Sequence, residues 1–116
     1  MEAKSKLHML FIIVDRNKGS KITDLLDDRG MNFHVIFLGR GTANSEILEY
    51  LGFGETEKDV VCSIIKEELI DDVFTILKDD FKIENPTNGV AFTVPINSIG
   101  GLDTFKQFIK NSQKGY

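Results

Sequence analysis

The chain of 116 residues has one cysteine, no apolar run long enough to cross a bilayer, and no excess of basic residues. A single cysteine, Cys62, cannot form a disulfide within the chain, which favours a reducing, cytoplasmic location. The apolar run 7–14 is much shorter than the roughly 18 residues of a membrane span, and no small-residue cleavage site follows it. We therefore expect neither membrane insertion nor a secretory signal.

The composition is that of a globular chain, with 41% hydrophobic and 28% charged residues, and the length fits one domain spanning residues 1–116. The net charge of −4 argues against binding of nucleic acid through a basic face. Basic residues gather in 1–22 and 101–116, and acidic residues in 66–80. Such an uneven distribution is typical of solvated helix faces.

The hydrophobic pattern predicts alternating strands and helices. Runs of strand length occupy residues 7–14, 33–38, 59–65 and 90–96. Apolar residues recur at helical spacing in residues 18–29, 66–80 and 102–110. Asn17 or Ser20 is expected to cap the first helix, and Gly30 to end it. The last strand can accommodate Pro95 only if the strand lies at an edge of the sheet or the proline lies near the end of the strand.

This order of elements, βαββαβ, predicts an α+β, ferredoxin-like sandwich with its core in about residues 7–100. A long loop, residues 41–58, separates the second and third strands and carries a short helical turn at 45–51. Loops of this length in a small domain are often functional. Both helices are expected on one face of the sheet. Because the strands are too apolar for the other face to be wet, the sequence predicts an oligomer.

The residues that most often carry catalysis or metals form no convincing constellation. His8 and His34 lie on strands that the third strand separates, so they are not expected to share a metal. Cys62 has no nearby positive charge or base to activate its thiol. The pairs 71–72 and 79–80 are acidic, but adjacent helical side chains point about 100° apart and do not converge on one atom. The sequence therefore predicts no enzyme.

Two glycine-bearing turns are the remaining candidates for a site. Gly39, Arg40, Gly41 and Thr42 follow the second strand, and the turn 85–89 precedes the fourth. Glycines let backbone N–H groups approach an anion closely, and Arg40 adds a donor suited to phosphate. Taken alone, such turns are also ordinary structural signals.

With these stretches in place, the chain resembles the nitrogen-regulatory PII family and its PII-like relatives over about residues 7–100. The resemblance rests on the element order and on three stretches. They are Gly30-Met31-Asn32 before the second strand, Gly39-Arg40-Gly41 at the loop base, and residues 88–96. The segment 47–58 looks like a divergent branch of the family.

The resemblance implies a homotrimer without a tightly bound cofactor, in which ADP or ATP binds as an effector between subunits. The loop 40–57 then regulates a partner protein, a transporter, enzyme or regulator, in nitrogen metabolism. The nucleotide contacts implied are Asn32, Gly39, Arg40, Gly41, Thr42, Asn88 and Gly89. The partner contacts are expected on Ile47, Leu48, Tyr50 and Leu51.

The chain also departs from the family pattern. Thr42-Ala43 stands where the family has Arg-Gln, and Val90 replaces a phosphate-binding lysine. The missing glutamine argues against sensing of 2-oxoglutarate. Tyr50 lacks the sequence context of uridylylation, and packing on the 45–51 turn is the better explanation for it. The loss of the lysine leaves an alternative: a constitutive trimeric protein-interaction module whose ligand clefts have degenerated.

Overall fold

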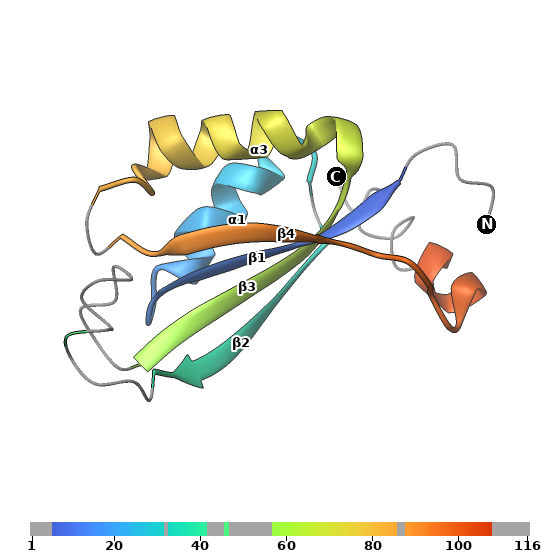
Figure 1. Cartoon of the computed structure of the whole chain (residues 1–116), viewed down its shortest axis with the longest axis horizontal. Helices are drawn as coiled ribbons and strands as arrows, with labels where there is room; N and C mark the ends of the chain where they lie inside the picture. The colour runs from blue at the N-terminus through green and yellow to red at the C-terminus, as the bar shows by residue number, and fades with distance from the viewer. Residues whose placement is uncertain (1–5, 32, 42–45, 47–56, 86–87, 108–116) are drawn as a thin grey trace.

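The structure, a computed structural model, describes residues 6–31, 33–41, 46, 57–85 and 88–107. Four strands form one antiparallel sheet, with two helices on one of its faces (Figure 1). In chain order the elements are β1 (Leu7–Asp15), α1 (Gly19–Asp27), β2 (His34–Arg40), β3 (Glu57–Lys66), α3 (Ile70–Ile76) and β4 (Val90–Pro95). A 3₁₀ turn (Glu67–Leu69) precedes α3 and a π-helical turn (Leu77–Phe81) follows it.

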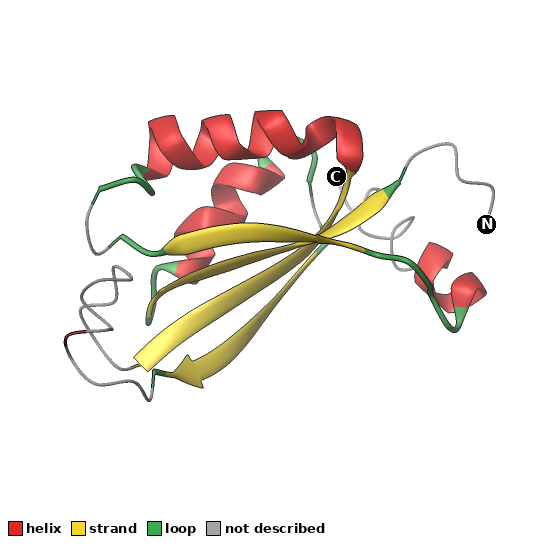
Figure 2. Ribbon diagram, viewed as in Figure 1, coloured by secondary structure: helices red, strands yellow, loops and turns green. Residues whose placement is uncertain are grey.

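The sheet order is β2-β3-β1-β4, so the predicted βαββαβ sandwich is confirmed (Figure 2). β3 separates β1 from β2, which keeps His8 and His34 apart as the sequence predicted. β4 lies at an edge and Pro95 is its last residue, so both conditions expected for that proline are met. β2 ends later than predicted, because Gly39 and Arg40 continue the pairing with Lys58 and Glu57 of β3.

The start of α1 corrects the sequence prediction. Neither Asn17 nor Ser20 caps the helix: Lys18 occupies the N-cap position and makes no side-chain cap bond. The carboxylate of Asp59 on β3 accepts the backbone N–H groups of Asn17 and Gly19 instead, at 2.9 and 3.0 Å. The other end follows the prediction, since Gly30 has a φ of 83° and Met31 N–H donates to the carbonyl of Leu26.

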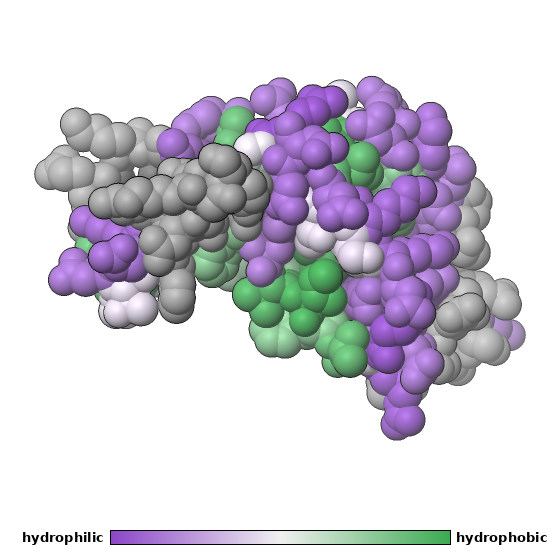
Figure 3. Space-filling view, turned by 180° about the vertical axis from the view of Figure 1, so that it is seen from behind, coloured by the Kyte–Doolittle hydropathy of each residue, from purple (hydrophilic) through white to green (hydrophobic). Residues whose placement is uncertain are grey.

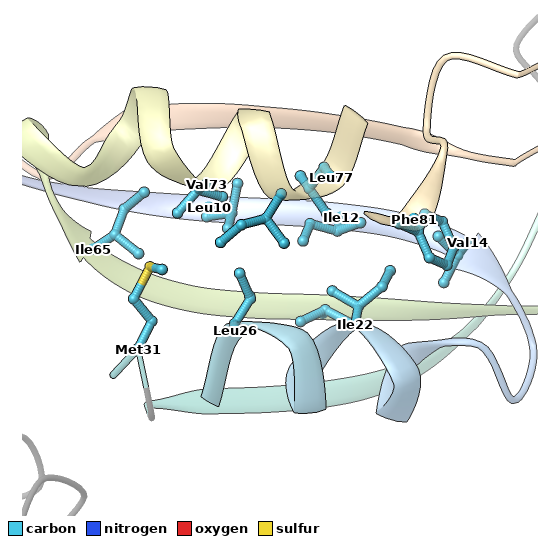
Figure 4. Packing of buried hydrophobic residues seen from close by; sticks show 12 residues of the cluster. Leu10, Ile12, Val14, Ile22, Leu26, Met31, Ile65, Val73, Leu77 and Phe81 are labelled. Carbon is cyan, nitrogen blue, oxygen red and sulfur yellow. The ribbon is translucent and has the colours of Figure 1, made fainter. Parts of the chain in front are cut away.

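The core lies between the sheet and the two helices (Figure 4). Leu10, Ile12 and Val14 alternate along β1 and are fully buried against Ile22 and Leu26 of α1. Val73, Ile76, Leu77 and Phe81 close the core from the α3 side, with Met31, Val61 and Ile65 completing it. Among the described residues, none of the helices has the length and apolar character needed to cross a bilayer.

The face of the sheet opposite the helices is apolar and no described element covers it. We call it the open face. The strand register places on it Met9, Phe11, Ile13, Val35, Phe37, Val60, Cys62, Ile64, Val90, Phe92 and Val94. The rings of Phe11 on β1 and Phe92 on the edge strand β4 stack on this face, with their centroids 5.3 Å apart. A face of this composition is the one that the sequence predicts to be covered by a partner.

Candidate functional site at the loop-bearing end of the sheet

The two glycine-bearing turns lie at the same end of the sheet but at opposite edges. Gly39 lies near the end of β2 and Gly41 directly follows the strand, and the residues before β4 are Asn88 and Gly89. β3 and β1 lie between these strands, and three strand spacings amount to about 14 Å. One copy of the chain therefore does not bring the two turns together on a single phosphate. A second copy placed against one edge provides a way for them to converge.

Packing and backbone conformation within the chain do not require a glycine at position 39. A Cβ built on it meets only the Cγ2 of Val60 at 3.6 Å, an ordinary contact, and its φ lies outside the left-handed region. The neighbouring Arg40 is exposed, and Gly41 is half-buried. The absence of a packing requirement leaves close approach of another molecule as a physical reason for a glycine at this position.

Gly89 and Asn88 are different, because packing within the chain accounts for both. A Cβ on Gly89 would lie 2.4 Å from the carbonyl oxygen of Ile13, and its φ is 121°. The amide Nδ2 of Asn88 donates to the carbonyl of Lys82 at 2.8 Å and to that of Phe81 at 3.4 Å. Asn88 therefore caps the π-helical turn, and its NH₂ group is engaged within the chain.

A charged cluster lies next to the base of the loop, and sequence reasoning missed it. Arg16 donates through Nη2 to the carbonyl of Gly39 (2.9 Å) and through Nε to that of Lys58 (3.2 Å). Its Nε also lies 3.4 Å from Oδ1 of Asp59, and Lys58 pairs with Asp15 at 2.6 Å. The available signal was two charged pairs, 15–16 and 58–59, at strand ends that an antiparallel register brings together.

Asp59 is the residue of this cluster on which stability depends most. Replacing it with alanine leaves two backbone N–H groups at the start of α1 without their acceptor and removes the ion pair of Asp59 with Arg16. We expect Asp59→Ala to lower the free energy of unfolding by about 2–3 kcal/mol, measured by urea denaturation. Asp24→Ala, on the exposed side of α1, is the control and is expected to change it by less than about 0.5 kcal/mol. Equal effects would contradict the capping role.

Exposed apolar side chains flank the loop base on the helix side of β2. Leu38 is 71% exposed and Ile36 39%, and both lie on the face of β2 opposite to Phe37. α1 contacts the start of β2, where its Asp27 bonds His34, whereas Ile36 and Leu38 further along the strand remain exposed. Figure 3 shows a hydrophobic patch where β2 lies. The site thus combines an apolar surface with the backbone of Gly39–Gly41. A flat aromatic ring and an anionic group are suited to these two parts respectively.

The remaining sequence candidates fall in three groups. Asn32, Thr42, Ile47, Leu48, Tyr50 and Leu51 lie outside the described residues. His34 bonds Ser63 Oγ (2.6 Å) and Asp27 Oδ1 (2.9 Å), but Ser63 is 1% exposed, so this serine is not accessible to a substrate. Burial raises the pKa of the Cys62 thiol, which disfavours the reactive thiolate. Within the described part of the chain, no cluster of His, Cys, Asp and Glu is suited to a metal ion.

Comparison with solved structures identifies the fold. PII from Arabidopsis thaliana, bound to citrate, superposes with a TM-score of 0.60 at 16% identity, covering 84% of this chain and 83% of that one. The PII-like protein CPII from Thiomonas intermedia, bound to ADP, AMP and bicarbonate, gives 0.59 at 24% identity, with 81% and 97% covered. A functionally unknown protein from Pediococcus pentosaceus gives 0.59 at 12% identity, with 82% and 96% covered.

No protein-family model and no curated protein sequence matches the chain. At these identities the likeness establishes the fold, which is that of the PII and PII-like nitrogen regulatory proteins. The resemblance drawn from the sequence is confirmed at this level.

Proposed function

We propose that this chain is a PII-like signalling protein that assembles as a homotrimer through its open face and binds an adenine nucleotide between copies. The observation that carries the proposal is the position of the two glycine-bearing turns: they share one end of the sheet but stand at opposite edges. Assembly of copies places the β2 edge of one chain beside another chain, and a ligand there contacts residues of both.

The chemistry of the β2 end supports a nucleotide. Leu38 and Ile36 offer apolar surface to a base, and the backbone N–H groups of Gly39–Gly41 and the guanidinium of Arg40 suit phosphate. On the β4 side, Asn88 and Gly89 contribute backbone groups, because the amide of Asn88 is engaged. CPII, which has the same fold, was solved with ADP and AMP bound. Asn32 and Thr42 remain further contacts proposed from sequence.

The signal is proposed to pass through the loop between β2 and β3 to a partner protein. The contacts proposed on Ile47, Leu48, Tyr50 and Leu51 come from the sequence. A ligand shifts a loop equilibrium only by its difference in affinity for the two loop states, so binding and loop exchange have to be measured together. A partner captured by the protein and released by nucleotide would identify the target and test the role in nitrogen metabolism.

The alternative is a constitutive trimeric interaction module. It is favoured by the packing of Gly89 and the hydrogen bonds of Asn88 within the chain, because these account for the turn without a ligand. Calorimetric titration with ADP and ATP, each with and without magnesium, on protein of known mass in solution separates the two. Saturable binding near one nucleotide per chain of a trimer supports the sensor. No heat at millimolar nucleotide, with a trimeric mass, supports the module.

Gly39→Ala tests the ligand contact without disturbing the fold. Because the added Cβ meets only Val60 at ordinary distance, we expect the free energy of unfolding to change by less than about 0.5 kcal/mol. The methyl group obstructs a phosphate approaching the backbone, so we expect ADP affinity to fall at least about tenfold, a difference of ~1.4 kcal/mol. Titration and urea denaturation of the same preparation give both values. Unchanged affinity would show that Gly39 does not approach the nucleotide.

A further inference from the structure

Arg16 connects three strands at the point where the loop leaves the sheet. It is the first residue after β1, and its backbone N–H donates to the carbonyl of Glu57 on β3. Its side chain bonds the carbonyl of Lys58 on β3 and that of Gly39 on β2. Gly39 and Lys58 are cross-strand partners in the ladder between β2 and β3. The guanidinium therefore bonds both strands at one rung, which we call the neck of the loop.

The chemistry of this contact is specific to arginine. A planar guanidinium presents several N–H donors in a fixed fork, whereas the ammonium of lysine is a point charge on a flexible stem. Asp59 Oδ1 at 3.4 Å and Glu57 Oε2 at 3.9 Å keep an anionic environment around the group. Hydrogen bonds from an ionised donor are about twice as strong as neutral ones, so the two carbonyls are held firmly.

We propose that Arg16 is a positioning residue for the ligand site: by holding the carbonyl of Gly39 it sets the orientation of the Gly39–Gly41 backbone toward the phosphates. This inference rests on the proposed function for its ligand. The role of Arg16 in holding the neck does not depend on the proposed function, because Arg16 contacts Gly39 and Lys58 without a ligand. Arg16 acts through the backbone of Gly39 and is not itself assigned a ligand contact.

Amide hydrogen exchange of the ligand-free protein tests the neck. We expect Arg16→Lys to accelerate exchange at residues 39–41 and 57–58 by about tenfold, while α3 exchanges as in the wild type. Arg29→Lys is the matched control: Arg29 is exposed near the end of α1, and its ion pair with Asp80 is 4.0 Å long. Exchange at the neck in this control is expected to stay at the wild-type rate.

Titration with ADP tests the positioning role. We expect Arg16→Lys to bind ADP about tenfold more weakly than the wild type, and Arg29→Lys to bind it equally well. Arg16→Ala is expected to lose affinity further and to recover it partly with millimolar guanidinium, but not with the same concentration of ammonium. Such selectivity between two cations would show that the planar donor fork of Arg16, rather than its positive charge alone, is required.

The outcomes separate this inference from the proposed function. Unchanged neck exchange in Arg16→Lys, or acceleration that is equal in α3 and throughout the sheet, overturns the holding of Gly39. Unchanged ADP affinity in a variant with a loosened neck overturns the positioning role. A wild-type protein that binds no ADP overturns the proposed function, and the exchange data then still decide whether Arg16 holds the neck.

Discussion

Phe37→Asp is expected to convert the assembled protein into single chains that remain folded. Phe37 lies on the open face and is 56% exposed in the single chain, so a carboxylate there stays hydrated in the monomer. In an assembly that covers the open face, the same carboxylate loses its water among Val35, Val60 and Cys62. The expected cost is about 3 kcal/mol per copy, roughly a hundredfold in association.

The measurement is the mass in solution by light scattering at several protein concentrations. The wild type is expected at three times the 13.1 kDa of one chain, and Phe37→Asp at the mass of one. Thr75→Asp, which adds the same charge to the exposed side of α3, is the control and should keep the wild-type mass. A Phe37→Asp protein that keeps the mass of the wild type would show that copies meet through another surface.

Gly89→Ala is expected to lower the free energy of unfolding by at least about 3 kcal/mol, or to prevent folding. Its Cβ would lie 2.4 Å from the Ile13 carbonyl oxygen and 2.8 Å from Val14 Cγ1, atoms of the central strand β1. Backbone atoms of a paired strand do not give way as a flexible side chain does. The φ of 121° adds strain, because this region is nearly restricted to glycine.

Two other glycines separate the clash from the strain. Gly101 has a φ of 66° with no atom within 4 Å of its Cβ position, so Gly101→Ala is expected to cost about 1 kcal/mol from strain alone. Gly100 also has an empty Cβ position and no left-handed φ, and Gly100→Ala is expected to be neutral. Urea denaturation at one protein concentration compares the three. A Gly89→Ala cost no larger than that of Gly101→Ala would contradict the clash.

The sequence predicted what depends on local patterns. Apolar runs placed each strand and α1 within about two residues. The predicted helix 66–80 matches α3 only together with its flanking 3₁₀ and π-helical turns, and the predicted helix 102–110 is helical over its described residues 102–107. The nearly unbroken apolar run of β1 implied two apolar faces on one sheet. The crossover rule and the element order then determined which strands are neighbours. An apolar second face was also predictable, because side chains alternate between the two faces of a strand and the strands are apolar on both.

The site was less predictable, since its contacts join residues far apart in sequence. Asp59 is 40 residues from Gly19, and Arg16 is 42 from Lys58, so local rules assigned the cap of α1 to Asn17 or Ser20. A glycine in a sequence also does not show whether the close neighbour it accommodates is a ligand or another part of the chain. Gly39 and Gly89 both suggested close approach of a ligand, yet the neighbour of Gly89 is the backbone of β1. Only the three-dimensional structure distinguishes these two causes.

The cap of α1 by Asp59 has a consequence for the order of folding. A helix of nine residues is too short to be stable alone in water, and no side chain at the N-cap of α1 accepts the free backbone N–H groups of its first turn. The acceptor, the carboxylate of Asp59, is brought to the start of α1 only when β3 has paired with β1, which closes a loop of some 40 residues. The transition state is therefore expected to contain the β1–β3 ladder before α1 is complete, which makes this small domain a slow folder for its helix content.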